Sequence, residues 1–263
     1  MQKVHSRDGT SIAFDTYGEG PAVVLVDGAL CYRDSGPSAP LAKMLAPNFT
    51  VYTYDRRGRG DSGDTAPWST EREVEDLDAI IRAAGGSAYV YGISSGAALA
   101  LEAANSGLPI KKLVLYEAPF IVDDSRAPIA NDFLPRLKQM VADDRRGDAV
   151  KAFMKLVGVP SFGIAIMRLL PVWKKLKAVA HTLPYDIGLL AGTQNGKPLS
   201  PRRWSAATVP TLVADGGKSP AWIRNGMRAL SLVLPNATYH TVEGQTHMLS
   251  AKAITPVLEE YFR

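Results

Sequence analysis

Two patterns of apolar residues alternate along the chain. Short runs rich in β-branched and aromatic residues predict strands, and longer runs with apolar residues every three or four positions predict helices. The predicted strands cover residues 11–17, 22–26, 49–54, 88–91, 112–116, 210–214 and 237–242, and the predicted helices cover 70–84, 95–105, 221–234 and 249–262. This alternation predicts an α/β fold with a mostly parallel sheet covered by helices on both faces.

One long segment, residues 121–203, breaks the alternation. Its apolar residues have helical spacing interrupted by prolines such as Pro135, Pro160 and Pro171, and no part of it resembles a strand. Because it falls between two predicted core strands, we expect a helical cap inserted into a core made of residues 1–120 and 204–263.

The composition is that of an ordinary globular protein. A chain of 263 residues is near the size at which one hydrophobic core stops growing, which suits one domain with an insertion. The single cysteine, Cys31, excludes an internal disulfide framework and a cysteine-rich zinc site. No segment has the roughly 18 uninterrupted apolar residues of a membrane span, so we expect a soluble, cytoplasmic protein with no membrane partner.

Positive charge is concentrated in the expected cap. Residues 126–177 hold eleven basic and four acidic side chains, although the net charge of the whole chain is only +4. Such a block is either a solvated helical surface or a means of attracting an anionic substrate or surface. No nucleic-acid-binding motif accompanies the charge, so we expect no nucleic-acid partner.

The strongest chemical signal is Gly92-Ile93-Ser94-Ser95-Gly96, which fits the pattern G-x-S-x-G. A predicted strand ends just before Ser94 and a predicted helix begins just after it, which is the setting of a nucleophile elbow. A serine nucleophile needs a base to accept its proton. His247 lies in the loop before the last predicted helix, where its side chain can reach back over the sheet. The alternative is a tight turn that contains a structural serine.

The order of elements, the elbow and the late histidine together resemble the α/β-hydrolase superfamily. The resemblance implies a triad in which Ser94 is the nucleophile and His247 the base, with no metal and no organic cofactor. It also implies an oxyanion hole built from the amide of Ser95 and the amide of Gly28 or Ala29.

The acid of the triad is less obvious. Most superfamily members carry it after the strand that follows the cap, and here that position holds Ser219. The candidates are Glu117, at the end of the strand after the elbow helix, then Asp215, then Asp123 or Asp124. We favour Glu117 because zearalenone lactonases and one group of haloalkane dehalogenases place the acid at this earlier strand.

Further matches resemble the zearalenone lactonases. They are Asp27-Gly28-Ala29, where most members have His-Gly, and Ser94-Ser95-Gly96-Ala97 at the elbow. Within the expected cap, Trp173 and His181 are candidates for the substrate pocket, since a cap usually excludes water and holds an apolar substrate.

These features predict a serine hydrolase that cleaves a carboxylic ester or lactone through an acyl-enzyme, with an apolar small molecule as substrate. One alternative is a non-hydrolytic enzyme on the same residues, such as a lyase, cyclase or decarboxylase. Another is a ligand-binding protein with a slow triad. The sequence assigns no particular ester or lactone and no oligomeric state.

Overall fold

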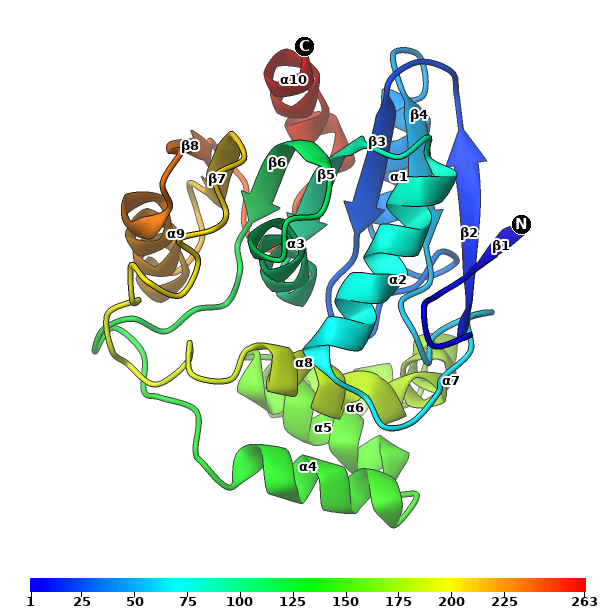
Figure 1. Ribbon diagram of the computed structural model, residues 1–263. Coiled ribbons are helices and arrows are strands. Elements are labelled where there is room, and N and C mark those ends of the chain that lie inside the picture. The colour runs from blue at the N-terminus through cyan, green and yellow to red at the C-terminus, as the bar shows by residue number, and fades with distance from the viewer.

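The computed structural model describes residues 1–263 as one eight-stranded sheet with helices on both faces (Figure 1). The strands lie in the order β1-β2-β4-β3-β5-β6-β7-β8, and β2 is antiparallel to both of its neighbours while all other pairs are parallel. Their bounds are β1 Gln2–His5, β2 Ser11–Tyr17, β3 Ala22–Val26, β4 Thr50–Tyr54, β5 Ala88–Ile93, β6 Ile110–Tyr116, β7 Thr211–Gly216 and β8 Ala237–Val242. The predicted α/β class and the seven predicted strands are confirmed.

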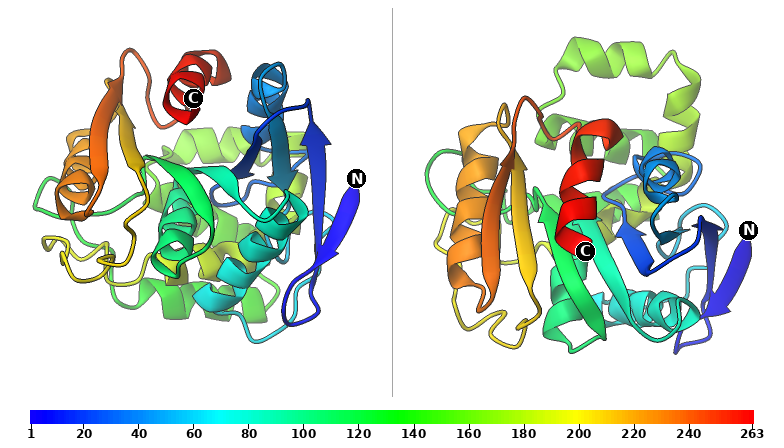
Figure 2. Two further views of the ribbon diagram at one scale, coloured as in Figure 1. Left: turned by 45° about the horizontal axis from the view of Figure 1, so that its top comes forward. Right: turned by 90° about the horizontal axis from the view of Figure 1, so that it is seen from above.

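Five helices cover the sheet: α1 Ser38–Leu45, α2 Thr70–Ala83, α3 Ser95–Asn105, α9 Ala221–Val233 and α10 Ala251–Phe262. The helices α2, α3 and α9 pack on one face, and α1 and α10 pack together on the other (Figure 2). Strand residues alternate between the two cores: Val24 and Val26 face α2 and α3, whereas Val23 and Leu25 face α1 and α10. The four predicted helices are confirmed, but the short α1 was not predicted.

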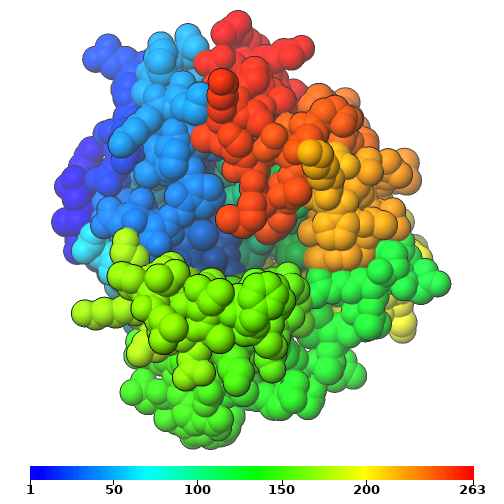
Figure 3. All heavy atoms as spheres, turned by 180° about the vertical axis from the view of Figure 1, so that it is seen from behind, coloured from blue at the N-terminus to red at the C-terminus, as the bar shows by residue number.

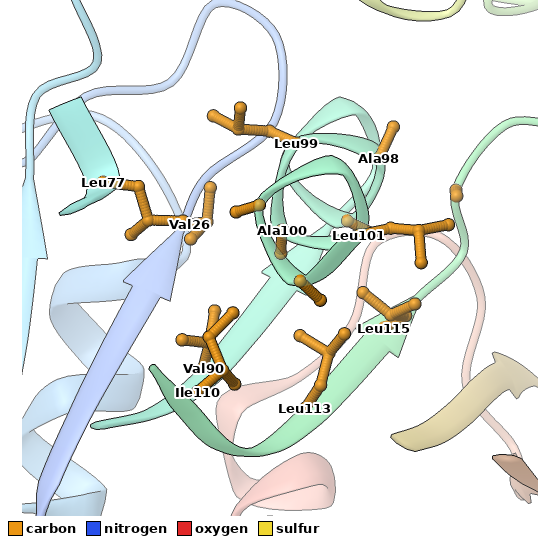
Figure 4. Packing of buried hydrophobic residues seen from close by; sticks show 14 of the residues in the cluster. Val26, Leu77, Val90, Ala98, Leu99, Ala100, Leu101, Ile110, Leu113 and Leu115 are labelled. Carbon is orange, nitrogen blue, oxygen red and sulfur yellow. The ribbon is translucent and has the colours of Figure 1, made fainter. Parts of the chain in front are cut away.

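The small-residue helix α3 packs tightly against the centre of the sheet. Its residues Ala100 and Leu101 lie with Val90 of β5 and Leu113 of β6 in one buried cluster (Figure 4). Alanines let the backbone of α3 approach the strands closely. This packing fixes the first turn of α3, which directly follows Ser94.

Residues 121–203 contain helices and no strand, as predicted. The helices are α4 Phe133–Ala142, α5 Arg146–Leu156, α6 Ser161–Met167, α7 Pro171–Ala178, the 3₁₀ turn η1 Ala180–Thr182 and α8 Leu183–Leu189. They form a separate layer at the carboxyl ends of the parallel strands, seen as the green to yellow-green part of Figures 1 and 3. No helix is long and apolar enough to cross a membrane.

A buried ionic network ties this helical layer to the core. Asp186 of α8, only 1% exposed, accepts hydrogen bonds from Arg56 at 2.8 Å and from Arg59 at 2.7 and 2.9 Å, and both arginines follow β4. Arg56 also pairs with Glu73 of α2 at 2.7 Å. Burial by itself would raise the pKa of Asp186, but the guanidinium groups of Arg59 and Arg56 hold it below its ordinary value. Burying a carboxylate of this kind costs free energy unless its charged partners are present, so the charge of Asp186 depends on Arg56 and Arg59.

We expect Asp186→Asn to lower the free energy of unfolding by about 3–5 kcal/mol, because it leaves the buried Arg59 without a carboxylate. Urea denaturation at neutral pH measures the loss. The matched control is Asp148→Asn on α5, which breaks an exposed ion pair with Arg145 just before that helix and should cost less than about 1 kcal/mol. Equal losses in the two variants would contradict a structural role for the network.

The free energy of unfolding that Asp186→Asn removes should depend on pH. Because the folded-state pKa of Asp186 is lowered, its contribution is complete above the unfolded value of about 3.9 and disappears as pH falls through the folded-state pKa. The stability gap between wild type and Asp186→Asn should therefore narrow below about pH 4.

Candidate active site

Ser94 occupies a strained turn between β5 and α3. Its backbone has φ 59° and ψ −129°, a conformation that L-residues rarely adopt. Its N–H donates to the carbonyl of Tyr116 at 2.9 Å, which ties the turn to the neighbouring strand β6. A Cβ atom on Gly96 would lie 2.2 Å from the carbonyl oxygen of Val26, so only glycine fits there. This geometry is that of a nucleophile elbow.

The turn after β3 lies directly against Ser94. A Cβ atom on Gly28 would lie 2.9 Å from the Cβ of Ser94. The backbone N–H groups of Gly28 and Ala29 donate no hydrogen bond within the protein, and the N–H of Ser95, the first residue of α3, has no partner within the helix. Free N–H donors beside a nucleophile are suited to stabilise a developing oxyanion, and the positive end of the α3 dipole adds to this effect.

His247 is hydrogen-bonded to Glu117. The distance from Nδ1 of the imidazole to Oε2 of the carboxylate is 2.9 Å. The carboxylate is fully buried, and the histidine side chain is 39% exposed. Such a bond orients the ring and leaves the other nitrogen, Nε2, available for a proton. His247 and Ser94 line the same cavity, although no hydrogen bond joins them in this structure. Catalytic hydrogen bonds are often formed only when substrate is bound.

The second oxygen of Glu117 is also fixed. Oε1 accepts from the backbone N–H of Gly216 at 2.7 Å and from the hydroxyl of Ser219. Ser219 follows β7, and its hydroxyl binds a carboxylate that comes from the end of the neighbouring strand β6. Sequence reasoning missed this contact, although the absence of a carboxylate at 219 was a signal that something else must act there.

None of the other candidate acids contacts His247. The buried carboxylate of Asp215 accepts a hydrogen bond from Tyr239 and pairs with Arg224 of α9. Its side chain faces α9 because side chains alternate along β7, and Ala214 faces the other core. Asp123 binds Ser125 and Asn225, and Asp124 is exposed. The structure therefore brings together Ser94, His247 and Glu117, and leaves out Asp215, Asp123 and Asp124.

A cavity of about 570 Å³ opens above Ser94 and His247. Most of its wall is apolar, and the side chains that form it come from α5, α8, α9 and the segment before α4: Ile129, Phe153, Leu156, Ile187, Trp222 and Ile223. Such a volume suits a small organic molecule. No group of three or more histidine, cysteine, aspartate or glutamate side chains is arranged to hold a metal ion.

The prediction that Trp173 and His181 line this pocket is wrong. Trp173 of α7 packs in the core of the helical layer and borders a separate, strongly charged depression. His181 lies 3.8 Å from Asp64. Burial and the nearby Arg146 lower the pKa of His181. Both residues were chosen from composition alone, which does not show which face of a helix points toward the cleft.

The buried network reaches the turns around Ser94, and sequence reasoning missed it. The hydroxyl of Ser95 donates to Asp186 at 2.7 Å. Arg59 donates to the carbonyl of Gly28 at 2.7 Å, and Arg56 donates to that of Asp27 at 3.3 Å. One group of charged side chains thus holds both turns that flank Ser94. Three arginines within residues 56–59 were the available signal, but a sequence does not show that they are buried.

Comparisons with known proteins agree with the fold. The family model described as "Alpha/beta hydrolase family" matches residues 22–258. A "Pimeloyl-[acyl-carrier protein] methyl ester esterase" of Xanthomonas campestris pv. campestris is 30% identical over 247 residues, 89% of this chain and 90% of that protein.

Solved structures give the same answer. The crystal structure of an alpha/beta hydrolase from Sphaerobacter thermophilus is similar over the whole of both chains, with 54% identity and a TM-score of 0.91. The enol-lactonase of Burkholderia xenovorans shares the fold at 20% identity and a TM-score of 0.70, over 99% of each chain. The predicted superfamily is confirmed, and this chain belongs to the alpha/beta hydrolase family.

Proposed function

We propose that the protein is a serine hydrolase of carboxylic esters or lactones. The observation that carries this proposal is the hydrogen bond between His247 and the buried Glu117, which orients the imidazole as a base requires. His247 borders the same cavity as Ser94, the proposed nucleophile. Relatives named as esterases support an ester substrate. The acid on β6 is also what the resemblance to zearalenone lactonases implies, and that resemblance stays a prediction.

The reaction would follow the acyl-transfer route. Ser94 Oγ attacks the substrate carbonyl while Nε2 of His247 takes its proton. The carbonyl oxygen becomes an oxyanion that accepts from the N–H groups of Ser95 and of Gly28 or Ala29. The carbon–oxygen bond to the alcohol then breaks, and His247 returns the proton to the leaving oxygen. A water molecule, activated by His247, releases the acid from Ser94.

We also propose that residues 121–203 act as the cap of this site, over a core of residues 1–120 and 204–263. What supports this is the cavity wall, since α5 and α8 supply Phe153, Leu156 and Ile187 to it. A mostly apolar wall suits an apolar portion of a small-molecule substrate.

The two alternatives make different predictions for a simple aryl ester. A hydrolase with an acyl-enzyme intermediate should give a burst of phenol equal to the enzyme concentration and then steady turnover. A binding protein with a slow triad would give the burst alone, and a lyase, cyclase or decarboxylase would give neither.

We expect Ser94→Ala to abolish ester hydrolysis while the protein remains folded, because Ser94 carries the nucleophile and its side chain faces a cavity. A fluorophosphonate probe should label the wild type at Ser94 and should not label the variant. The control is Ser106→Ala, at the exposed end of α3, which should be labelled like wild type. Labelling of Ser94→Ala would contradict the assignment.

Replacing the acid gives a second test. Glu117→Gln keeps the size of the side chain but removes its charge, and loss of an orienting carboxylate costs on the order of 10⁴ in kcat. The matched control is Asp215→Asn, an equally buried carboxylate that does not contact His247, and it should lose far less. Steady-state kinetics of both variants, with circular dichroism to check folding, would decide. A larger loss in Asp215→Asn would mean that the triad is wrong.

A further inference from the structure

The cavity above Ser94 carries an unbalanced positive charge. Arg126, Lys155 and Asp186 are the formally charged lining residues apart from His247. Asp186 is neutralised by Arg56 and Arg59 behind the wall. Arg126 and Lys155, by contrast, form no ion pair with a carboxylate, and the one hydrogen bond of Arg126 goes to a backbone carbonyl. The two cations that face the cavity are therefore free to meet an anion.

Arg126 is held in place by contacts that leave most of its donors unused. Its guanidinium lies 4.1 Å from the ring centre of Trp222 of α9, within cation–π range. One N–H donates to the carbonyl of Leu156 at the end of α5, and no other hydrogen bond is formed. A guanidinium has five N–H donors in one plane, and stacking through its face uses none of them. The donors that do not bind Leu156 therefore stay available for a ligand.

The energetic cost of this arrangement points to a ligand. Arg126 is half-buried, and burial lowers the pKa of its guanidinium, so the charge is partly removed from water without a counter-ion in the protein. A carboxylate is the natural partner because its two oxygens match the planar fork of arginine. Most of the remaining wall is apolar, with Ile129, Leu190 and Ile223 among its residues.

Resting on the proposed function, we infer that the substrate is an ester or lactone that bears a carboxylate, which Arg126 binds while Ser94 attacks the carbonyl. Lys155 on the last turn of α5 adds charge at the same wall. An apolar spacer separates the two polar ends of the substrate. The basic block of residues 126–177 thus contributes two charges to the site itself.

Binding is measured first, in the Ser94→Ala background, where no hydrolysis interferes. The probes are monomethyl esters of straight-chain dicarboxylic acids of 4 to 10 carbons, and the corresponding dimethyl esters, by calorimetry. We expect the half-esters to bind at least about tenfold more tightly, and Arg126→Gln to remove that preference. Arg126→Lys should restore part of it, since a lysine keeps the charge but not the fork.

The matched control is Lys151→Gln, which removes a positive charge from α5 at a position that does not line the cavity. It should leave the preference for half-esters intact. No preference in the parent protein, or an equal loss in Lys151→Gln and Arg126→Gln, would overturn the inference.

Hydrolysis shows which side of the ester carries the carboxylate. One arm uses 4-nitrophenyl half-esters of the same diacids, and the other uses butyrate esters of hydroxybenzoates. We expect a ratio of kcat/KM for the charged over the matched neutral ester that falls roughly 10- to 100-fold in Arg126→Gln, mainly through KM. An unchanged ratio in both arms would overturn the carboxylate assignment. Failure of the protein to hydrolyse any ester would instead overturn the proposed function, and the calorimetry would still decide the binding site.

Discussion

The buried pairing of Asp186 with Arg56 and Arg59 is the interaction on which the site depends. It joins the helical layer to the end of β4, and the same three side chains contact Ser95, Gly28 and Asp27 through the hydrogen bonds described above. Charges this deeply buried stabilise a fold only when every partner is in place. The helical layer and the two turns beside Ser94 are therefore fixed together. Removing the carboxylate of Asp186 from α8 would also loosen the backbone of the proposed oxyanion hole.

The carboxylate of Glu117, the proposed acid of the triad, is held by contacts from two neighbouring strands. Glu117 directly follows the last residue of β6, and its backbone is left-handed, with φ 48°. Gly216 and Ser219 of the β7 side satisfy one oxygen and leave the other for His247. Because parallel strands end at one edge of the sheet, a side chain from β6 reaches the same point as one from the loop after β7.

The distribution of charge around the cavity connects these two features to the proposed substrate. Asp186 is paired with two arginines, and the fully buried Glu117 does not line the cavity, so neither presents an unpaired negative charge to a ligand. Arg126 remains without a carboxylate and stacked on Trp222. A mostly apolar cavity that is lined by unpaired positive charge and by Ser94, the proposed nucleophile, favours a substrate with an apolar portion and an anionic group.

The sequence by itself determined the fold class, the order of the elements and the superfamily, because these depend on local periodicity and on motifs of adjacent residues. It also led to the proposal that Ser94, His247 and Glu117 form the triad. It missed α1, whose short run of eight residues gives little periodicity. It placed Trp173 and His181 at the pocket wrongly, and it did not identify Asp186, Ser219 or Arg126. Those roles depend on contacts between residues about 30 to 130 positions apart, and on which charged side chains are buried. Only the tertiary structure decides such contacts, because burial and pairing of a charge are set by neighbours that the local sequence does not contain.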